Sequence, residues 1–194
     1  CIRDRHQIVD VCENEYDEHP FDAVNSDLNT VLQDANVASQ IGLAEMFDAS
    51  IGKSTVLMPF GGKYQLTPEE GSVQKLPVHG MTNTCSVMTY GYDPKVSKYS
   101  PYLGASYSVV EALARITALG ADYKKCRLSN QEYFERLGAD AQKWGQPFEA
   151  LLGLIDAQLA FETPSIGGKD SMSGTYKDIP VSYTHLRAHE TAAN

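Results

Sequence analysis

The sequence predicts a domain of the α+β or α/β class, with a mixed sheet and helices packed on one face. The first observation is the order of the predicted elements along the chain, which runs strands, helix, strand, helices and strand. The second is the pair Ser100-Pro101, an N-cap residue followed by proline at the first helical position. The third is the apolar periodicity that continues from this pair to Gly120, where the helix is expected to end.

Composition limits the classes of function. The chain carries 16 Lys and Arg against 25 Asp and Glu, a formal net charge of −9, which argues against binding nucleic acid or an anionic membrane through bulk charge. No apolar run reaches the length of a membrane span. Cys12, Cys85 and Cys126 are scattered and form no CxxC pair. Reduced thiols in the cytoplasm are therefore expected, rather than a disulfide framework or a zinc site.

The two ends of the chain encode one DNA word read from opposite strands. One set of codons for residues 1–4 is TGT-ATA-AGA-GAC, and its reverse complement encodes Val-Ser-Tyr-Thr, the sequence at 181–184. This pattern indicates an inverted sequencing adapter, so residues 1–5 and 181–194 are excluded from the interpretation of the fold. The histidines in the second range are therefore not interpreted as metal ligands.

The first part of the remaining chain is predicted to contain a strand end, a linker and helices. A short apolar run at 8–11 is interpreted as the end of a strand, and an acidic stretch at 13–20 as a solvated linker. Residues 26–47 are predicted to be helical in two pieces, with Ser26 as the N-cap of the first.

Strands and turns are predicted next. Runs rich in β-branched and apolar residues indicate strands at 54–59, 73–78 and 84–90. Glycine-containing turns are expected at 60–65 and 91–94.

The second half of the chain is predicted to be mainly helical. After the helix that begins at Ser100-Pro101, residues 121–128 are predicted to form a turn and a short strand. Residues 130–137 are predicted to form a helix, and a longer helix is expected from about Trp144 to Phe161.

The segment with the strongest chemical signal is SIGGKDSMSG at 165–174. Two adjacent glycines permit a turn with positive φ or a close approach to a ligand. Lys169 and Ser171 have the chemistry to hold phosphate oxygens, and Asp170 has the chemistry to hold Mg²⁺. The alternative is an ordinary surface turn, because the segment matches neither a Walker loop nor the dinucleotide fingerprint.

Two further residues are candidates for binding. Glu111 lies among the apolar residues of the helix that begins at Ser100-Pro101, and a carboxylate near a buried face needs a partner, which a metal would supply. A structural carboxylate is the alternative. Lys63 follows two glycines and is a candidate for a phosphate contact, with a solvated lysine as the alternative.

Five segments together resemble phosphoribosylformylglycinamidine synthase, the glutamine-dependent enzyme of purine biosynthesis. They occur in the expected order and span nearly all of 27–180: DASIG at 48–52, TVLMPFGGKYQ at 55–65, QEYFERL at 131–137, WG at 144–145, and SIGGKDSMSG at 165–174.

The resemblance implies an architecture. The family's synthetase part holds two tandem copies of a fold resembling aminoimidazole ribonucleotide synthetase, and this chain resembles the sheet-forming half of the second copy. Residues 6–47 would be the end of a preceding domain, a linker and helices, and residues 48–180 an incomplete sheet domain that stops before its last strand. The implied partners are the first synthetase-like copy and the glutaminase domain of the parent chain.

The resemblance also implies an activity. In the family, ATP activates the formyl amide oxygen of formylglycinamide ribonucleotide, and ammonia from glutamine then displaces phosphate to give the amidine. The implied cofactors are ATP or ADP and Mg²⁺. The segment by itself is expected to be inactive, and no catalytic residue is assigned.

Site residues follow from the resemblance. It implies a nucleotide-binding role for one short run: Gly167, Gly168, Lys169, Asp170 and Ser171. Lys63 is added to this set from its position after two glycines. Glu111 matches a carboxylate metal ligand of the family. Arg115 stands where some members carry an asparagine ligand, and no carboxylate is present near His79. Because arginine cannot coordinate Mg²⁺, the alternative is that Arg115 replaces the charge of the ion.

Two other functions remain open. One is a non-catalytic, structural nucleotide-binding half, holding ADP and Mg²⁺ within the same enzyme. The other is another ATP-dependent kinase or synthetase of the superfamily, of the thiamine-phosphate or selenophosphate type.

Overall fold

The structure of the chain, a computed structural model, describes residues 7–11, 27–33, 37–47, 54–177 and 179–180. The adapter assignment for 1–5 and 181–194, the N-cap Ser26, the acidic linker and Cys12 lie outside the described residues. Of the remaining cysteines, Cys85 and Cys126 are free thiols. No helix among the described residues is long and apolar enough to cross a membrane.

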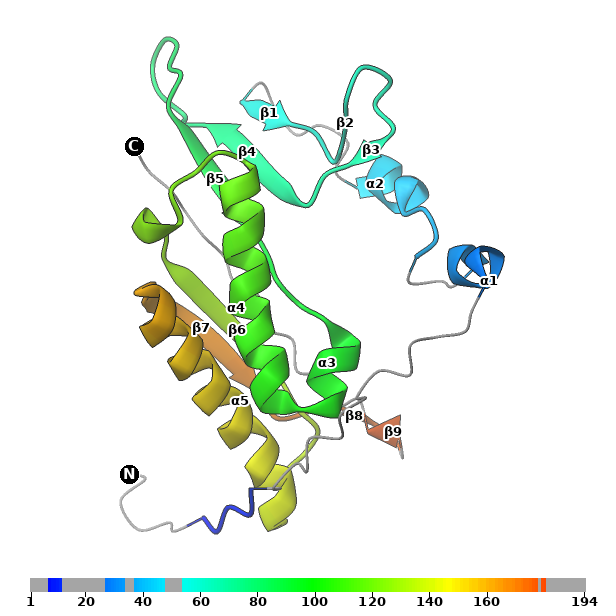
Figure 1. Cartoon of the computed structure of the whole chain (residues 1–194), viewed down its shortest axis with the longest axis vertical. Coiled ribbons are helices and arrows are strands. Elements are labelled where there is room, and N and C mark those ends of the chain that lie inside the picture. The colour runs from blue at the N-terminus through cyan, green and yellow to red at the C-terminus, as the bar shows by residue number, and fades with distance from the viewer. Residues whose placement is uncertain (1–6, 12–26, 34–36, 48–53, 178, 181–194) are drawn as a thin grey trace.

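Two long helices form the centre of the fold. Helix α4 (Pro101–Ala118) packs beside α5 (Ala141–Phe161), as Figure 1 shows. The predicted start of α4 is confirmed, because the Ser100 side chain accepts a hydrogen bond from the backbone N–H of Leu103 at 3.2 Å. The core that these helices share with the strand and loop beneath them consists of apolar side chains: Ala105, Val109, Ala112, Leu113, Leu128, Phe134, Leu137, Ala150, Leu154 and Ala157.

The strands among the described residues form four small sheets. The largest is antiparallel, in the order β1 (Thr55–Leu57), β4 (Gly71–Lys75) and β5 (Cys85–Thr89). Strand β6 (Leu128–Tyr133) pairs in parallel with β7 (Ser165–Ser171), and α5 connects them. The predicted mixture of helices and strands is confirmed, and the parallel and antiparallel pairings occupy separate sheets.

The remaining elements are short. Two pairs of two-residue strands occur: β2 (Phe60–Gly61) with β3 (Thr67–Pro68), and β8 (Thr175–Tyr176) with β9 (Ile179–Pro180). The short helices are α1 (Leu28–Gln33), α2 (Ile41–Phe47), α3 (Pro94–Tyr99) and the 3₁₀ turn η2 (Tyr123–Lys125). The two helical pieces predicted within 26–47 correspond to α1 and α2.

The helix predicted at 130–137 is wrong. Residues 128–133 form β6, and an extended loop follows in which Phe134 is completely buried. The backbone of this loop continues the contact with β7, since the N–H of Phe134 donates to the carbonyl of Ser171 at 2.8 Å. Pairing with a strand more than 30 residues away has overridden the local helical pattern.

The start of one helix differs from the prediction, and a second, short helix follows a segment predicted only as a turn. Helix α5 begins at Ala141, because the Asp140 side chain accepts hydrogen bonds from the N–H groups of Gln142 and Lys143, and Pro147 lies inside the helix. The turn predicted at 91–94 leads directly into α3, whose N-cap is Asp93. In both cases an aspartate supplies the cap.

Small residues allow α4 and α5 to approach closely. A β-carbon placed on Gly153 of α5 would lie 2.1 Å from the backbone oxygen of Tyr102 on α4. The hydroxyl of Ser106 donates to the carbonyl of Gly153 at 3.0 Å. The short distance between the helices therefore requires glycine at position 153, although glycine is unfavourable in the interior of a helix.

We expect Gly153→Ala to destabilise the chain by about 1–3 kcal/mol, because the added methyl group forces the helices apart. Urea unfolding followed by circular dichroism measures this change. Gly42→Ala is the matched control, since Gly42 lies in helix α2 and a β-carbon placed on it would meet nothing within 4 Å. Equal stability of Gly153→Ala and wild type would show that the helix contact is looser than described.

Candidate functional site

The segment Gly167–Ser171 lies in strand β7, so the turn predicted there is wrong. Neither Gly167 nor Gly168 has a positive φ. Gly168 instead allows close approach of the neighbouring strand, because a β-carbon at this position would lie 2.5 Å from the backbone oxygen of Asn130 on β6. The second glycine of the pair is explained by packing of backbone against backbone.

The strand places Lys169 and Asp170 on opposite faces of the two-stranded sheet, because side chains alternate along a strand. Asp170 is in register with Glu132 of β6, and Lys169 is in register with Gln131. The Lys169 ammonium lies 5.7 Å from the ring centroid of Tyr133, which occupies the same face as Gln131. The two side chains therefore alternate along β7, although both residues line one pocket.

Glu132 is a functional candidate that the sequence did not reveal. It is only 6% exposed, and burial, together with the neighbouring charge of Asp170, raises the pKa of its carboxyl to about 7. The predicted helix at 130–137 concealed this residue, because a glutamate on a short helix would be expected in solvent. If 128–133 had been assigned to a strand, Glu132 would have been predicted on the same face as Leu128, a core residue.

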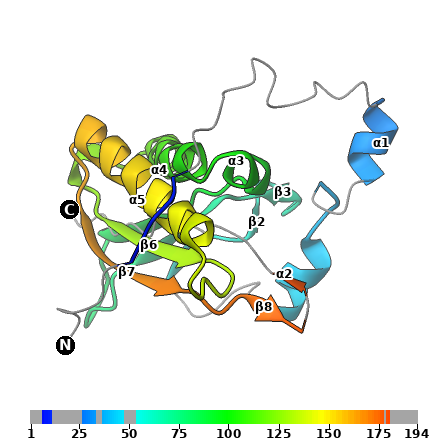
Figure 2. The same cartoon turned by 90° about the horizontal axis from the view of Figure 1, so that it is seen from below.

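A pocket of about 540 Å³ adjoins this carboxylate pair. We refer to it as the β6–β7 pocket. Its floor is formed by β6 and β7, which contribute Asn130 and Lys169 as well as the two carboxylates. One wall is α5, and Val9 from the N-terminal segment lies on another side. Figure 2 shows residues 7–11 running alongside α5 and β6, where the N–H of Asp10 donates to the carbonyl of Ala141 at 3.0 Å. The lining is mainly apolar on the helix side: Trp144, Pro147, Phe148, Leu151 and Leu154.

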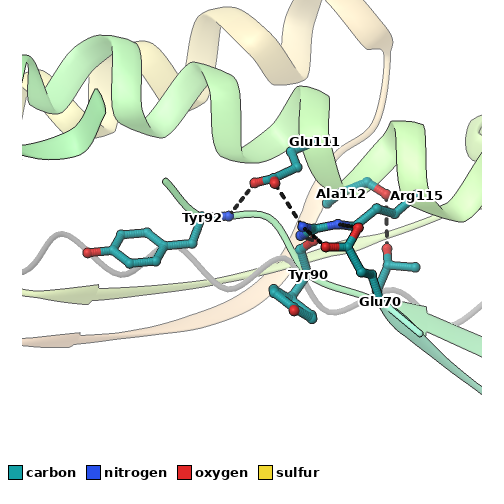
Figure 3. Close-up of polar contacts among 7 residues, drawn as sticks. Glu70, Tyr90, Tyr92, Glu111, Ala112 and Arg115 are labelled. Carbon is teal, nitrogen blue, oxygen red and sulfur yellow. Dashed lines mark hydrogen bonds and ion pairs between the residues drawn. The ribbon is translucent and has the colours of Figure 1, made fainter. Parts of the chain in front are cut away.

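Glu111 lies in a different charged cluster, shown in Figure 3. One carboxylate oxygen forms an ion pair with the Nη2 atom of Arg115 at 2.9 Å, and the other accepts the backbone N–H of Tyr92 at 2.7 Å. The partner that a carboxylate at this position needs is thus present within the chain. Glu111 as a metal ligand stays a prediction.

Arg115 holds this cluster together. Its guanidinium makes two hydrogen bonds of 2.9 Å to the carboxylate of Glu70, donates to the carbonyl of Tyr90 at 2.6 Å, and lies 4.5 Å from the Tyr90 ring centroid. The arrangement joins α4 to one end of the β4–β5 pair, where Glu70 precedes β4 and Tyr90 follows β5. One guanidinium is shared by two carboxylates.

The described residues do not supply a complete set of metal ligands at Glu111. Within the described part of the chain, no group of three or more His, Cys, Asp or Glu side chains is placed to hold an ion. Lys63 lies in the turn between β2 and β3, with its ammonium 5.4 Å from the Tyr64 ring centroid. That turn and β7 belong to different sheets and lie apart in Figures 1 and 2.

The stability of the chain should depend on pH through Glu132. The pKa is raised from 4.5 to about 7, so the folded state holds this proton more tightly than the unfolded state. The associated stability is fully present below pH 4.5 and is lost as the pH rises towards 7. Glu132→Gln stays neutral, and we expect it to raise the free energy of unfolding at pH 8 by about 1–3 kcal/mol.

Urea unfolding at pH 4.5, 6 and 8 tests this expectation, with the largest gain at pH 8 and little gain at pH 4.5. Glu45→Gln, on the exposed part of α2, is the control and should match wild type at each pH. Parallel pH profiles for wild type and Glu132→Gln would contradict the raised pKa.

The chain has relatives among curated proteins, although no protein-family model matches it. It is 26% identical over 165 residues to phosphoribosylformylglycinamidine synthase subunit PurL of Pyrobaculum aerophilum, and this match covers 85% of the chain and 22% of the relative. The same subunit of Pyrobaculum calidifontis is 28% identical over 165 residues, covering 84% of the chain and 22% of the relative. That of Methanocaldococcus jannaschii is 27% identical over 179 residues, covering 88% and 22%.

Solved structures show the same fold. Thermotoga maritima PurL complexed with ATP superposes with a TM-score of 0.60 at 16% sequence identity, covering 78% of this chain and 23% of that chain. The PurLQS structure from the same organism gives a TM-score of 0.62 at 17% identity, covering 79% and 24%. Sequence and fold agree, and the chain is a homologue of a segment of phosphoribosylformylglycinamidine synthase subunit PurL, about a fifth of that protein's length, as its sequence motifs predict.

Proposed function

We propose that this chain is a segment of the ATP- and glutamine-dependent ligase that converts formylglycinamide ribonucleotide to formylglycinamidine ribonucleotide in purine biosynthesis. The observation that carries the proposal is the sequence similarity to PurL subunits over about 85% of the chain. The agreement of the fold with PurL structures supports it. The chain spans 22% of the length of these relatives.

The proposal includes the setting of the segment. Residues 6–47 are the end of a preceding domain with a linker and helices, and residues 48–180 are the synthetase-like sheet domain. The partners are the first synthetase-like copy and the glutaminase of the parent enzyme, which acts in the cytoplasm. The PurLQS assembly of Thermotoga maritima supports the idea of partner subunits.

We further propose that the segment binds a nucleotide through the face of β7 that carries Lys169. The solved PurL structures include complexes with ATP, AMPPCP and ADP, which supports a nucleotide as the ligand. Lys169 is exposed, and alternation puts Gly167 and Ser171 on the same face, so an ammonium and a hydroxyl lie beside a backbone without side-chain bulk. On the other face, Asp170 and Glu132 would repel phosphate.

Within this proposal the segment serves as a structural nucleotide-binding half, and Arg115 takes the place of a cation at Glu111. The bidentate pair between Arg115 and Glu70, and the ion pair between Arg115 and Glu111, support this substitution. Mg²⁺ would then enter with the nucleotide phosphates rather than through Glu111.

The activity is tested with the DNA that flanks this chain. The extended gene, without the adapter-derived ends, should restore growth without purines to a strain that lacks this synthase. An ATP- and glutamine-dependent ligase assay on the purified product should give the same result. A well-expressed, folded product that neither restores growth nor turns over formylglycinamide ribonucleotide would contradict the proposed activity.

Nucleotide binding is tested separately by calorimetric titration of ADP, with and without Mg²⁺. We expect Lys169→Ala to weaken binding about tenfold or more, as the loss of a charged hydrogen bond requires. Lys95→Ala is the matched control, since Lys95 is an exposed lysine of α3 to which no binding role is assigned. Glu111→Ala should leave the Mg²⁺ dependence unchanged. Loss of that dependence in Glu111→Ala would show that Glu111 is a metal ligand and that Arg115 does not replace the ion.

A further inference from the structure

The first described segment of the chain, residues 7–11, is seated on helix α5 through its backbone. The N–H of Asp10 donates to the carbonyl of Ala141 at 3.0 Å. A β-carbon placed on Gly145, one turn further along α5, would lie 2.2 Å from the backbone oxygen of Asp10 and 3.5 Å from the α-carbon of Val11. Glycine at position 145 therefore admits the segment to the surface of the helix, because a side chain there would push it away.

The same segment borders the β6–β7 pocket. Val9 lies on one side of the pocket, and the α5 side chains Trp144 and Phe148 line it as well. Figure 2 shows residues 7–11 alongside α5 and β6. Lys169, the residue proposed to hold a phosphate, lines this pocket too. We refer to residues 7–11 as the N-terminal strap.

The N-terminal strap is held by few interactions. All of its residues are exposed, and Ile8, Val9 and Val11 are 75%, 38% and 40% exposed. Among the described residues, the bond from Asp10 to Ala141 is the one hydrogen bond between the strap and the rest of the chain. A segment that buries little apolar surface and has one such bond leaves its seat at a small cost in free energy.

We propose that the N-terminal strap is a displaceable closure of the β6–β7 pocket. When it is seated at Gly145 it covers the Trp144 end of the pocket, and when it leaves, that end opens to solvent and to ligands. The apolar side chains on the α5 side favour the closed state, because covering them removes apolar surface from water.

The strap also offers a route by which another domain would control the pocket. In the setting proposed above, residues 6–47 include the end of a preceding domain, so a movement of that domain would pull the strap from its seat. This coupling rests on the proposed function, whereas the closure itself does not.

Acrylamide quenching of tryptophan fluorescence in the full chain tests the closure. Trp144 is the single tryptophan of the chain and lies between Ala141 and Gly145, the two positions that hold the strap. Asp10→Pro removes the N–H donor, and we expect it to raise the quenching constant about twofold, since one hydrogen bond holds the closed state. Asp10→Ala keeps the N–H and is the matched control, with the quenching constant of wild type.

Gly145→Ala tests the seat from the side of the helix. The added methyl group should displace the strap and raise the quenching constant as Asp10→Pro does, whereas Gly42→Ala should leave it unchanged. Asp10 is exposed, so Asp10→Pro should fold normally even if Gly145→Ala does not, and circular dichroism checks both.

Two results would overturn the proposal. One is wild-type quenching in both Asp10→Pro and Gly145→Ala, and the other is an equal rise in Asp10→Ala and Asp10→Pro. The measurement involves neither a nucleotide nor turnover, so its failure is distinguishable from failure of the proposed ligase function.

Discussion

The close contact between α4 and α5 is the constraint on which the rest of the structure depends. At Gly153 the two helix backbones approach so closely that no side chain fits between them. Helix α5 also connects the parallel strands β6 and β7 and lines one pocket with them. The floor and wall of the β6–β7 pocket are therefore set by the same packing that forms the core. A change in the helix separation would move the pocket walls as well.

The alternation of β7 determines how its chemistry is used. In a turn, Lys169 and Asp170 could both face one ligand, as the glycine pair in the sequence suggests. In a strand, their side chains alternate, although both residues line one pocket. The close approach of β6 at Gly168 holds β7 in this conformation.

The sequence predicts the elements whose signals are local. The cap at Ser100-Pro101 fixes the start of α4, and the family motifs identify the fold. Strand β6 could not be predicted in the same way, because QEYFERL has a helical pattern and its strand conformation depends on pairing with residues 165–171. The same long-range pairing creates the burial of Glu132, so the most perturbed carboxyl of the site has no local sequence signal. The Arg115 cluster could be predicted from the sequence in part. Arg115 and Glu111 are four residues apart on one helix, whereas Glu70 is distant in the sequence.

Two pairs of neighbouring carboxylates among the described residues differ in whether an arginine lies between them. Glu70 and Glu111 share the guanidinium of Arg115, which is anchored further by the Tyr90 carbonyl and ring. Glu132 and Asp170 form no ion pair with another described residue, although Glu132 is only 6% exposed. Burial makes an unneutralised charge more costly, so stability alone would favour placing the arginine at the second pair. The fold lowers this cost in another way, because burial raises the pKa of Glu132 to about 7 and so favours its neutral form.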